Sequence, residues 1–525
     1  MLREIVFAHF FGVGAHADVF RAALRAPNVL QNLLGEGTLS AAFIPIYSAM
    51  RSEGRDEQAR RFAGAVFGLM LVVVLAVAGL GVLLARPIVM AFAPGFAADA
   101  SAVATGELSV DRFEATVRAV RIVFPMTAIL VLSAWALGVL NSHRRFFVSY
   151  AAPVAWNAAI VASLVGAAEW WLVDDAPYRL SRLLTAVFAG ALAGAVMQFA
   201  IQWPSALRCL GGLRLSFSPA APGVRDALRR FGPALMGRGV YQLSAWLDLF
   251  LASFLAAGAV AALGYAQVLY LLPISLFGMS VAAAALPELS RDRGKGIDVV
   301  RAKAIEALSQ MGFLTIPTIV GYLVLGSILV SALFEHGEFG SEGRWLTYLV
   351  LSAYSLGLLA TTASRLFQNV FFALGDTRTP ARIAVYRMIV SAVSGAVLML
   401  WLDSYALRDL LSARVGAEGS SVEVSGLHAG ALGLALGSAL GAWIEWWRLA
   451  RALRLHGARV LMPWRRLAGF LAMAVASVIP PAIVWSRLPG LGAWAALLVV
   501  VLPYALIYLL LARLRNLSEW KKWLG

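Results

Sequence analysis

Charged residues are scarce in this 525-residue chain, at 14% of the total, whereas apolar residues make up 60%. A water-soluble domain of this composition would lack the polar side chains needed to cover its surface. The single cysteine, Cys209, excludes an intrachain disulfide framework and provides no cluster of metal ligands. Together with a mean hydropathy of +0.78, these absences indicate a polytopic membrane protein.

Catalytic motifs are also missing. The six histidines are scattered, no HExxH motif occurs, and Gly12 and Gly14 follow no strand that could make them a phosphate loop. No connecting loop is long enough to fold as a separate domain, so the net charge of +15 has no soluble surface on which to bind nucleic acid. We therefore expect no enzyme activity, no cofactor and no nucleic-acid partner.

Long apolar runs, each able to cross about 30 Å of hydrocarbon, recur along the chain. After a short opening segment they predict thirteen helices, over 16–49, 60–86, 113–140, 148–171, 181–208, 227–255, 259–289, 300–333, 344–374, 380–402, 428–455, 464–486 and 491–514. The sequence therefore predicts an all-α membrane protein of about fourteen transmembrane helices, the first of them truncated.

Lysine and arginine concentrate in alternate loops, the pattern that keeps basic residues in the cytoplasm. Loops 51–61, 208–230 and 448–466 are basic, whereas loop 87–111 contains neither residue. The alternation predicts an even number of spans and a basic C-terminal tail in the cytoplasm. Topology then accounts for most of the net charge, with a secondary attraction to anionic lipid.

A polar stripe follows one face of the helix predicted for 16–49. Its members recur at intervals of three and four residues, and they are Asp18, Arg21, Arg25, Asn28, Asn32 and Glu36. Charges at membrane depth cost roughly 2.5–3.5 kcal/mol each on insertion scales. The stripe therefore either faces a watery cavity, or its charges pair with one another or extend to the interface. Pro27 and the glycines at 35 and 37 weaken the same helix, as expected beside a cavity.

Other ionisable residues lie within the predicted helices. Arg238, Asp248 and Arg365 would be buried in the bundle, and an ion pair is an equal alternative to a binding role for Asp248. Arg387, seven residues after Pro380, is expected to extend to the interface. Because arginines outnumber acids there, the interior suits an anionic substrate, and a guanidinium can hold a phosphate with two hydrogen bonds.

A loose internal repeat is also visible. Ten residues separate Glu4 from Gly14 and Asp248 from Gly258, and a long helix containing prolines follows each glycine. The two copies would run in the same direction, as the parallel repeats of transporters do. A chance match of the acid-to-glycine spacing is the alternative.

The opening stretch LREIVFAHFFGVGAHADVFRAALRAPNVLQNLLGEGTLSAAFIP resembles the start of the MurJ (MviN) family of lipid II flippases, in the multidrug/oligosaccharidyl-lipid/polysaccharide exporter superfamily. Further similar segments are FAPGF (92–96), FPMTAILVLSAWALGVLNSHRRF (124–146), FGPALMG (231–237), ASFLAAG (252–258), LPISLFGMSV (272–281), LFEHGEF (333–339) and ALGDTRTPARIA (373–384). After these, the chain resembles the family only in its hydrophobic pattern.

The resemblance implies two pseudo-symmetric six-helix lobes, 1–215 and 223–455, and a final part, 463–525, whose two helices form a lipid-tail groove. It implies a flippase of the inner membrane that moves undecaprenyl-linked disaccharide-pentapeptide, lipid II, to the outer leaflet for peptidoglycan synthesis by alternating access. The implied partners are this anionic lipid-linked saccharide and membrane lipid. A monomeric state and an association with peptidoglycan synthesis enzymes are further expectations.

In the family, cavity arginines bind the pyrophosphate. The residues that match the family's pattern here are Arg3, Asp18, Arg25, Glu36 and Arg365. Two expected phosphate ligands are absent here, since Gln31-Asn32 replaces the family's Arg-Arg pair and Ala266-Gln267-Val268 replaces its Ala-Asp-Arg. Arg21 and Arg238 could substitute. The expected substrate-binding set is therefore Arg3, Asp18, Arg21, Arg25, Asn28, Gln31, Asn32, Glu36, Arg238, Gln267 and Arg365.

Asp248 matches an acid that belongs to a sodium site in some members, but the expected polar partners are Ser391 and Gly395 here, which leaves sodium coupling open. Family members begin about twenty residues earlier, and the opening segment is too short to cross the bilayer, so we expect a misplaced start or a truncated copy. The alternatives to a lipid II flippase are an exporter of another lipid-linked saccharide or a drug, and a non-transporting membrane scaffold.

Overall fold

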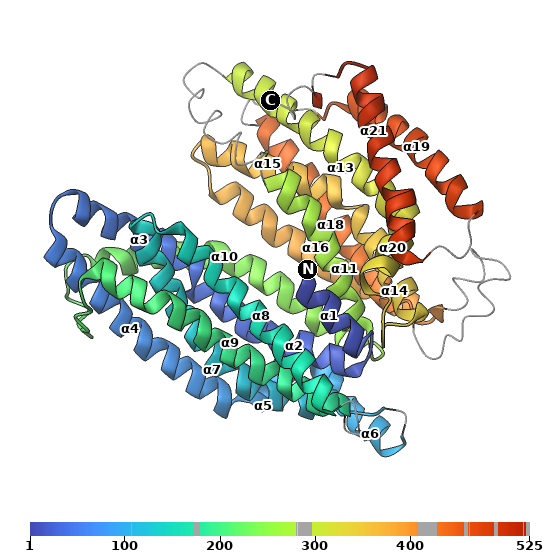
Figure 1. The fold of residues 1–525 in the computed structure, drawn as a ribbon. Coiled ribbons are helices and arrows are strands. Elements are labelled where there is room, and N and C mark those ends of the chain that lie inside the picture. Colours follow the sequence, from blue (N-terminus) through green and yellow to red (C-terminus); the bar gives the residue numbers. More distant parts are fainter. Residues whose placement is uncertain are drawn as a thin grey trace. The chain divides into compact units, whose positions relative to one another are not determined.

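The computed structural model describes residues 1–106, 108–171, 179–279, 281, 297–407, 428–455, 460, 462–487, 492–517 and 519–520. Over these ranges the chain consists of helices joined by short connections (Figure 1). Nine of the described helices are long and apolar enough to cross a membrane, and two bent helix pairs raise that number to eleven. The predicted all-α polytopic membrane protein is confirmed, whereas the described residues do not establish the number of about fourteen spans.

The chain forms two compact units, Met1–Phe254 and Leu255–Gly525. The first unit contains α1 (Leu2–Phe11), α2 (Ala15–Leu34), α3 (Glu36–Ser52), α4 (Asp56–Leu83), α5 (Ala85–Phe92), the short helix η1 (Pro94–Ala98), α6 (Asp99–Ala104), α7 (Arg112–Ser142), α8 (Phe146–Trp171), α9 (Arg179–Leu210) and α10 (Val224–Ala252). Helix α10 thus packs within the first unit. The functional division into 1–215, 223–455 and 463–525 stays a prediction.

The second unit contains α11 (Ala259–Pro273), η2 (Ile274–Met279), α13 (Ile297–Phe334), α14 (Ser341–Ser355), α15 (Leu358–Ala373), α16 (Arg378–Asp403), α18 (Gly430–Leu455), α19 (Trp464–Arg487), α20 (Ala493–Ala496), η5 (Leu497–Val501) and α21 (Leu502–Leu514). Most of these helices begin and end within a few residues of the predicted ranges. The predicted helix over 344–374 is two helices, α14 and α15, bent by 42°.

Helix α7 lies at the core of the first unit, where it packs against α2, α4 and α9. The indole N–H of Trp135, which is fully buried, donates to the carbonyl of Ala63 on α4 at 3.2 Å. The hydroxyl of Ser133 donates to Gln202 of α9 at 2.6 Å and accepts from Gln198 at 2.9 Å. These bonds satisfy polar groups that would be costly to bury alone, so they fix how α7 and α9 pack.

The helix predicted for 16–49 is interrupted once rather than twice. Helix α2 continues past Pro27 and ends at Leu34, and α3 begins at Glu36. A Cβ atom at position 35 would lie 2.4 Å from the carbonyl oxygen of Gln31, so only glycine fits this turn. Pro27 removes one backbone N–H without ending the helix, which a membrane helix tolerates when neighbours re-satisfy the freed group.

The segment predicted as loop 87–111 is also more ordered than expected. It contains most of α5, η1 and α6, and α5 meets the segment after it at an angle of 106°. Each of these helices is much shorter than the roughly 20 residues that a span requires. A search for long apolar runs therefore misses them.

Tyrosine hydroxyls satisfy carbonyls that prolines free in the second unit. Pro317 has no N–H for the carbonyl of Phe313, and the hydroxyl of Tyr508 on α21 donates to that oxygen at 2.8 Å. Tyr322 does the same at 2.7 Å for the carbonyl four residues before Pro273. The tyrosines thus hold the proline-containing helices against their neighbours.

Helices α16 and α18 pack closely through small residues. A Cβ atom on Gly437 of α18 would lie 2.3 Å from the Cα atom of Gly395 on α16. Two turns farther along α18, the buried carboxylate of Glu445 accepts from Arg387 at 2.7 Å. The guanidinium of Arg387 therefore pairs across the contact between α16 and α18, a partner that the sequence did not predict, and the expected extension of this side chain to the membrane surface stays a prediction.

Candidate functional site

Two arginines of the expected substrate-binding set meet around one carboxylate. Glu4 of α1 is 5% exposed and accepts from Nη2 of Arg3 at 2.6 Å and from Nη2 of Arg21 of α2 at 2.5 Å. The guanidinium of Arg3 also lies 5.7 Å from the ring centre of Trp156 on α8. The side chains of Arg3 and Arg21 keep 24% and 16% of their surface exposed. Two positive charges and one negative charge give the cluster a net charge of +1.

Arg25 lies one turn beyond Arg21 on α2. Its Nε donates to the backbone carbonyl of Ala245 on α10 at 3.1 Å, an interaction that orients the guanidinium without neutralising it. Farther along α2, Asn28 and Gln31 are half-buried and Asn32 is exposed. This part of α2 therefore combines arginines with neutral polar side chains, the residue types that bind phosphate and sugar hydroxyls.

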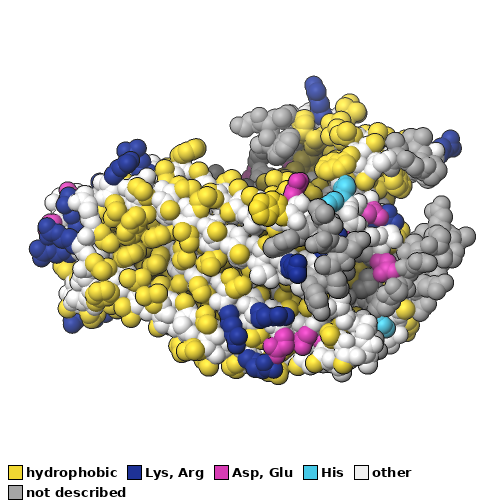
Figure 2. Space-filling view, turned by 60° about the horizontal axis from the view of Figure 1, so that its bottom comes forward, with side chains coloured by type: hydrophobic (Ala, Val, Ile, Leu, Met, Phe, Trp, Pro, Cys, Tyr) yellow, Lys and Arg dark blue, Asp and Glu magenta, His cyan; other side chains and the backbone are white. Residues whose placement is uncertain are grey.

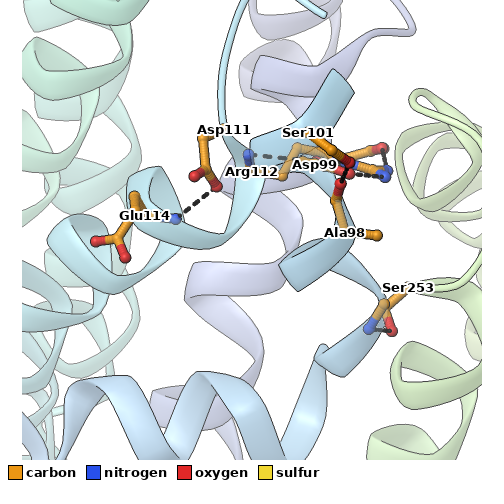
Figure 3. A network of polar contacts seen from close by, with 9 residues as sticks. Ala98, Asp99, Ser101, Asp111, Arg112, Glu114 and Ser253 are labelled. Carbon is orange, nitrogen blue, oxygen red and sulfur yellow. Dashed lines mark hydrogen bonds and ion pairs between the residues drawn. The ribbon is translucent and has the colours of Figure 1, made fainter. Parts of the chain in front are cut away.

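Asp18 has a different environment from the rest of the stripe. Its side chain has no exposed surface, and it accepts from Nη1 of Arg112 of α7 at 3.0 Å. Arg112 also donates to both carboxylate oxygens of Asp99, at 2.5 and 2.9 Å, as Figure 3 shows. Its guanidinium lies 4.4 Å from the ring centre of Phe96. Asp18 thus belongs to a buried Asp–Arg–Asp triad that joins α2, α6 and α7.

Two further hydrogen bonds hold the segment between α5 and α7. Asp111 caps α7 by accepting from the backbone N–H of Glu114 at 3.0 Å, and Ser253 accepts from the backbone N–H of Gly95 at 3.1 Å (Figure 3). Asp18 is paired, but with Arg112 of α7 rather than with another member of the stripe, as the pairing interpretation had expected. Sequence reasoning missed the partner Arg112, because it lies 94 residues away and no local pattern marks it.

The remaining expected residues lie on other helices. Gln267 on α11 and Arg365 on α15 are half-buried residues of the second unit, and Asp248 is half-buried on α10. The side chains of Glu36 and Arg238 lie outside the described residues. The proposed sodium partners Ser391 and Gly395 belong to α16, where they face α18.

Each unit contains an apolar cavity among its described residues. A cavity of about 650 Å³ is lined by residues of α2, α4, α5, α7 and α10. One of about 310 Å³ lies between α13 and α21, where Pro317, Tyr504 and Tyr508 form part of its wall. This second cavity is lined in part by α21, the last helix of the part 463–525 that was predicted to form a lipid-tail groove.

Comparisons with known proteins agree with one another. The family model described as lipid II flippase MurJ matches residues 7–489. The chain is 32% identical over 425 residues to a probable lipid II flippase MurJ of Rhizobium meliloti (strain 1021), which covers 79% of this chain and 74% of that protein. It is 28% identical over 498 residues to a protein of the same description from Vibrio cholerae serotype O1, covering 94% and 87%.

Solved structures show the same fold. The chain is similar to a lipid II flippase MurJ in an inward closed conformation, with a TM-score of 0.73, 22% identity and coverage of 98% of this chain and 96% of that one. It is also similar to an inward-facing multidrug resistance MATE family transporter of the MOP superfamily, with a TM-score of 0.63, 14% identity and coverage of 86% and 94%.

Proposed function

This chain belongs to the lipid II flippase MurJ family, and from that membership we propose that it moves lipid II from the inner to the outer leaflet of the cytoplasmic membrane. The family consists of transporters, so the protein is not an enzyme. The observation that carries the proposal is the family match over residues 7–489, nearly the whole chain. The substrate would be an undecaprenyl pyrophosphate that carries the peptidoglycan precursor.

The charges on α1 and α2 support an anionic head group. Arg3, Arg21 and Arg25 contribute three positive charges. In the described contacts, Arg3 and Arg21 both pair with the carboxylate of Glu4. A guanidinium presents five N–H donors in a planar fork and binds phosphate oxygens in pairs. A pyrophosphate could therefore share these arginines with Glu4, while the polyprenyl tail stays in apolar surroundings.

Glu4 would have two functions in such a site. It holds the guanidinium groups of Arg3 and Arg21 in fixed positions before substrate arrives, which lowers the conformational cost of binding. It also keeps the net charge of the cluster low, so that the phosphates could leave again after the units rearrange. Alternating access requires binding that is firm enough to select the substrate and weak enough to release it.

Several finer points are part of the proposal. The protein would act as a monomer in the cytoplasmic membrane with its C-terminus in the cytoplasm, and it would work beside the enzymes of peptidoglycan synthesis. Gln31, Asn32, Gln267 and Arg365 would contact the saccharide or phosphate. Asp248 would bind sodium only if another residue replaces the missing partners at Ser391 and Gly395.

The likeness to a multidrug transporter keeps a drug exporter as a second candidate, but it shows the fold alone. The Arg3, Arg21 and Arg25 side chains disfavour a cationic drug, since a carrier of cations needs a net acidic cavity. A sister exporter of another lipid-linked anionic saccharide would use the same arginines. Only a substrate-specific test separates that exporter from a lipid II flippase.

Rescue of a strain depleted of its own flippase provides that test. We expect the chain to restore growth and cell shape, and Arg25→Ala to abolish rescue at equal membrane abundance. Arg61→Ala, which removes an exposed arginine whose partner is Glu57, is the control and should rescue fully. Failure of the unaltered chain to rescue, despite insertion in the membrane, would contradict the lipid II assignment. Rescue by Arg25→Ala with full efficiency would instead make that residue structural.

A further inference from the structure

Helix α7 carries two exposed arginines on an otherwise largely buried surface. Arg118 and Arg121 follow Glu114 by four and seven residues, so all three lie on one helical face. Over the described part of the chain, neither arginine has an ion pair or a hydrogen bond from its side chain. Their positive charges are therefore available to a partner outside the protein.

A third arginine lies beside this face. Arg86 at the start of α5 is 65% exposed, pairs with Glu114 at 2.6 Å and lies 5.3 Å from the ring centre of Phe113. We call Arg86, Arg118 and Arg121 the α7 arginine site. With Glu114 included, this site has a net charge of +2. Figure 2 shows a mostly hydrophobic face on which basic and acidic side chains occur in small groups.

The depth of these arginines suits the head-group region of a bilayer. The 31 residues of α7 span roughly 46 Å, whereas the hydrocarbon core is about 30 Å thick. A helix centred in the bilayer would extend about 8 Å beyond the core at each end. Arg118 and Arg121 lie roughly 9 and 13 Å from the first residue of α7, which places them near the boundary of the core. Long arginine side chains at that depth extend to the lipid phosphates.

Helices α5 and α7, which carry these arginines, also line the apolar cavity of about 650 Å³. Arg86 lies between Leu84 and Ile88 in sequence, and Arg121 lies one turn before Phe124; all three of these apolar residues line the cavity. Gly81 lets the Phe124 ring lie against α4 in the cavity wall, because a Cβ atom at position 81 would lie 1.8 Å from that ring. Leu80 and Leu84, also in the wall, are 55% and 48% exposed, so the cavity opens at the surface.

We propose that the α7 arginine site binds the phosphate of an anionic phospholipid, one chain of which occupies this cavity. Positive charge at head-group depth and an apolar cavity beside it match the two parts of a lipid, whereas a free phosphate would use only the first. A zwitterionic lipid would bring a positive group to three arginines. The site belongs to the first unit alone, and the proposal does not depend on whether the chain transports lipid II.

Photo-crosslinking in nanodiscs tests the proposal directly. The full chain is reconstituted in phosphatidylcholine with a trace of phosphatidylglycerol that carries a diazirine on one acyl chain, and crosslinked peptides are mapped by mass spectrometry. We expect crosslinks within 80–92 and 239–246, and a roughly tenfold loss in the double variant Arg118→Gln, Arg121→Gln. The matched control Arg144→Gln, Arg145→Gln removes two exposed arginines after the other end of α7 and should change nothing.

Two further measurements keep the test decisive. Ala91→Trp places a large side chain in the cavity wall and should reduce crosslinking within 239–246 while the preference for the anionic lipid remains. Size-exclusion profiles exclude variants that misfold, and Arg118→Lys, Arg121→Lys should retain most of the crosslinking because it retains the charge. Equal crosslinking by diazirine analogues of phosphatidylglycerol and phosphatidylcholine, unaffected by Arg118→Gln, Arg121→Gln, would show an annular lipid only and would overturn the proposal.

Discussion

Arg112 has an unusual position for a guanidinium in a membrane protein, since its side chain is 5% exposed and lies between two carboxylates. Asp99 provides two of its hydrogen bonds, and Asp18, which is fully buried, provides a third. A buried charge is tolerated only when its partners compensate for the lost water. The stability of the first unit should therefore depend on all three members, but unequally.

We predict that Arg112→Met destabilises the protein more than Asp18→Asn. Removal of Arg112 takes from two neighbouring buried carboxylates the cation that they share, at a cost of about 3–5 kcal/mol. Asp18→Asn leaves Arg112 paired with Asp99 and should cost about 1–3 kcal/mol. The melting temperature in detergent measures both, and Asp56→Asn, whose side chain is 69% exposed, is the control. Equal losses for the two buried variants would show that the triad does not act as described.

His143 provides a prediction about pH. It follows α7, and its Nε2 lies 3.0 Å from the hydroxyl of Tyr47. Burial lowers the pKa of its imidazole below the ordinary value of 6.5, and the positive charge of Arg51 adds to this effect. The unfolded chain therefore binds a proton at a higher pH than the folded chain. The contribution of His143 to stability is complete above pH 6.5 and is lost as the pH falls through the lowered pKa.

We therefore expect His143→Asn to show a smaller decrease in melting temperature than the unaltered protein when the pH is lowered from 7.5 to 5. The comparison between the two proteins cancels the titration of carboxylates that both contain. His336→Asn, at a histidine in the second unit, is a matched control. An unchanged pH dependence in His143→Asn would contradict the assignment.

The interface of α16 and α18 shows how small residues set the distance between helices. Gly433, Gly437 and Gly441 recur every four residues on α18 and let the two backbones approach. Gly437→Leu should destabilise the second unit by about 1–3 kcal/mol or more, because its Cβ would lie 2.3 Å from the Cα of Gly395. Gly469→Leu is the control in α19, where no atom lies within 4 Å of an added Cβ. Thermal unfolding compares the two, and similar losses would argue against close packing at Gly437.

The contact of Tyr508 with α13 allows a double-mutant cycle. Tyr508→Phe removes the hydroxyl that bonds the Phe313 carbonyl and leaves a buried acceptor without its donor, at about 1–3 kcal/mol. Pro317→Ala restores a backbone N–H that can bond the same carbonyl. We therefore expect Tyr508→Phe to cost much less in the Pro317→Ala background, with a coupling energy of about 1 kcal/mol or more. Additive losses in the melting temperature would show that the hydroxyl does not replace the missing N–H.

The long helices could be predicted because a membrane span needs a long apolar run, and such runs are visible in the sequence alone. The short helices α5 and α6 have no such signal, and the effect of Pro27 depends on neighbours that the sequence does not identify. Prediction of the candidate site from the sequence is limited in the same way. The stripe on α2 follows from spacing, but the different partners of Asp18, Arg21 and Arg25 come from α7, α1 and α10. Contacts between distant helices have no local pattern.

Each compact unit contains an ion pair with a buried carboxylate, Asp18 with Arg112 in the first and Glu445 with Arg387 in the second. Helices joined in this way tend to move as one body, because separating them would expose a charge to the bilayer. Alternating access by rearrangement of whole units agrees with this distribution of charge. The direction of transport then depends on how the chain is oriented in the membrane.

That orientation can be tested with the one cysteine removed. In a Cys209→Ser background, Ser101→Cys lies in α6 and Ser218→Cys in the basic connection before α10, and both positions are exposed. Because arginine-rich connections remain in the cytoplasm, a membrane-impermeant maleimide should label Ser101→Cys in intact spheroplasts, and Ser218→Cys only after lysis. Rescue of a flippase-depleted strain by both variants would show that the added cysteines leave the fold intact. The reverse labelling pattern would place the C-terminus outside the cytoplasm. It would contradict the proposed movement of lipid II from the inner to the outer leaflet.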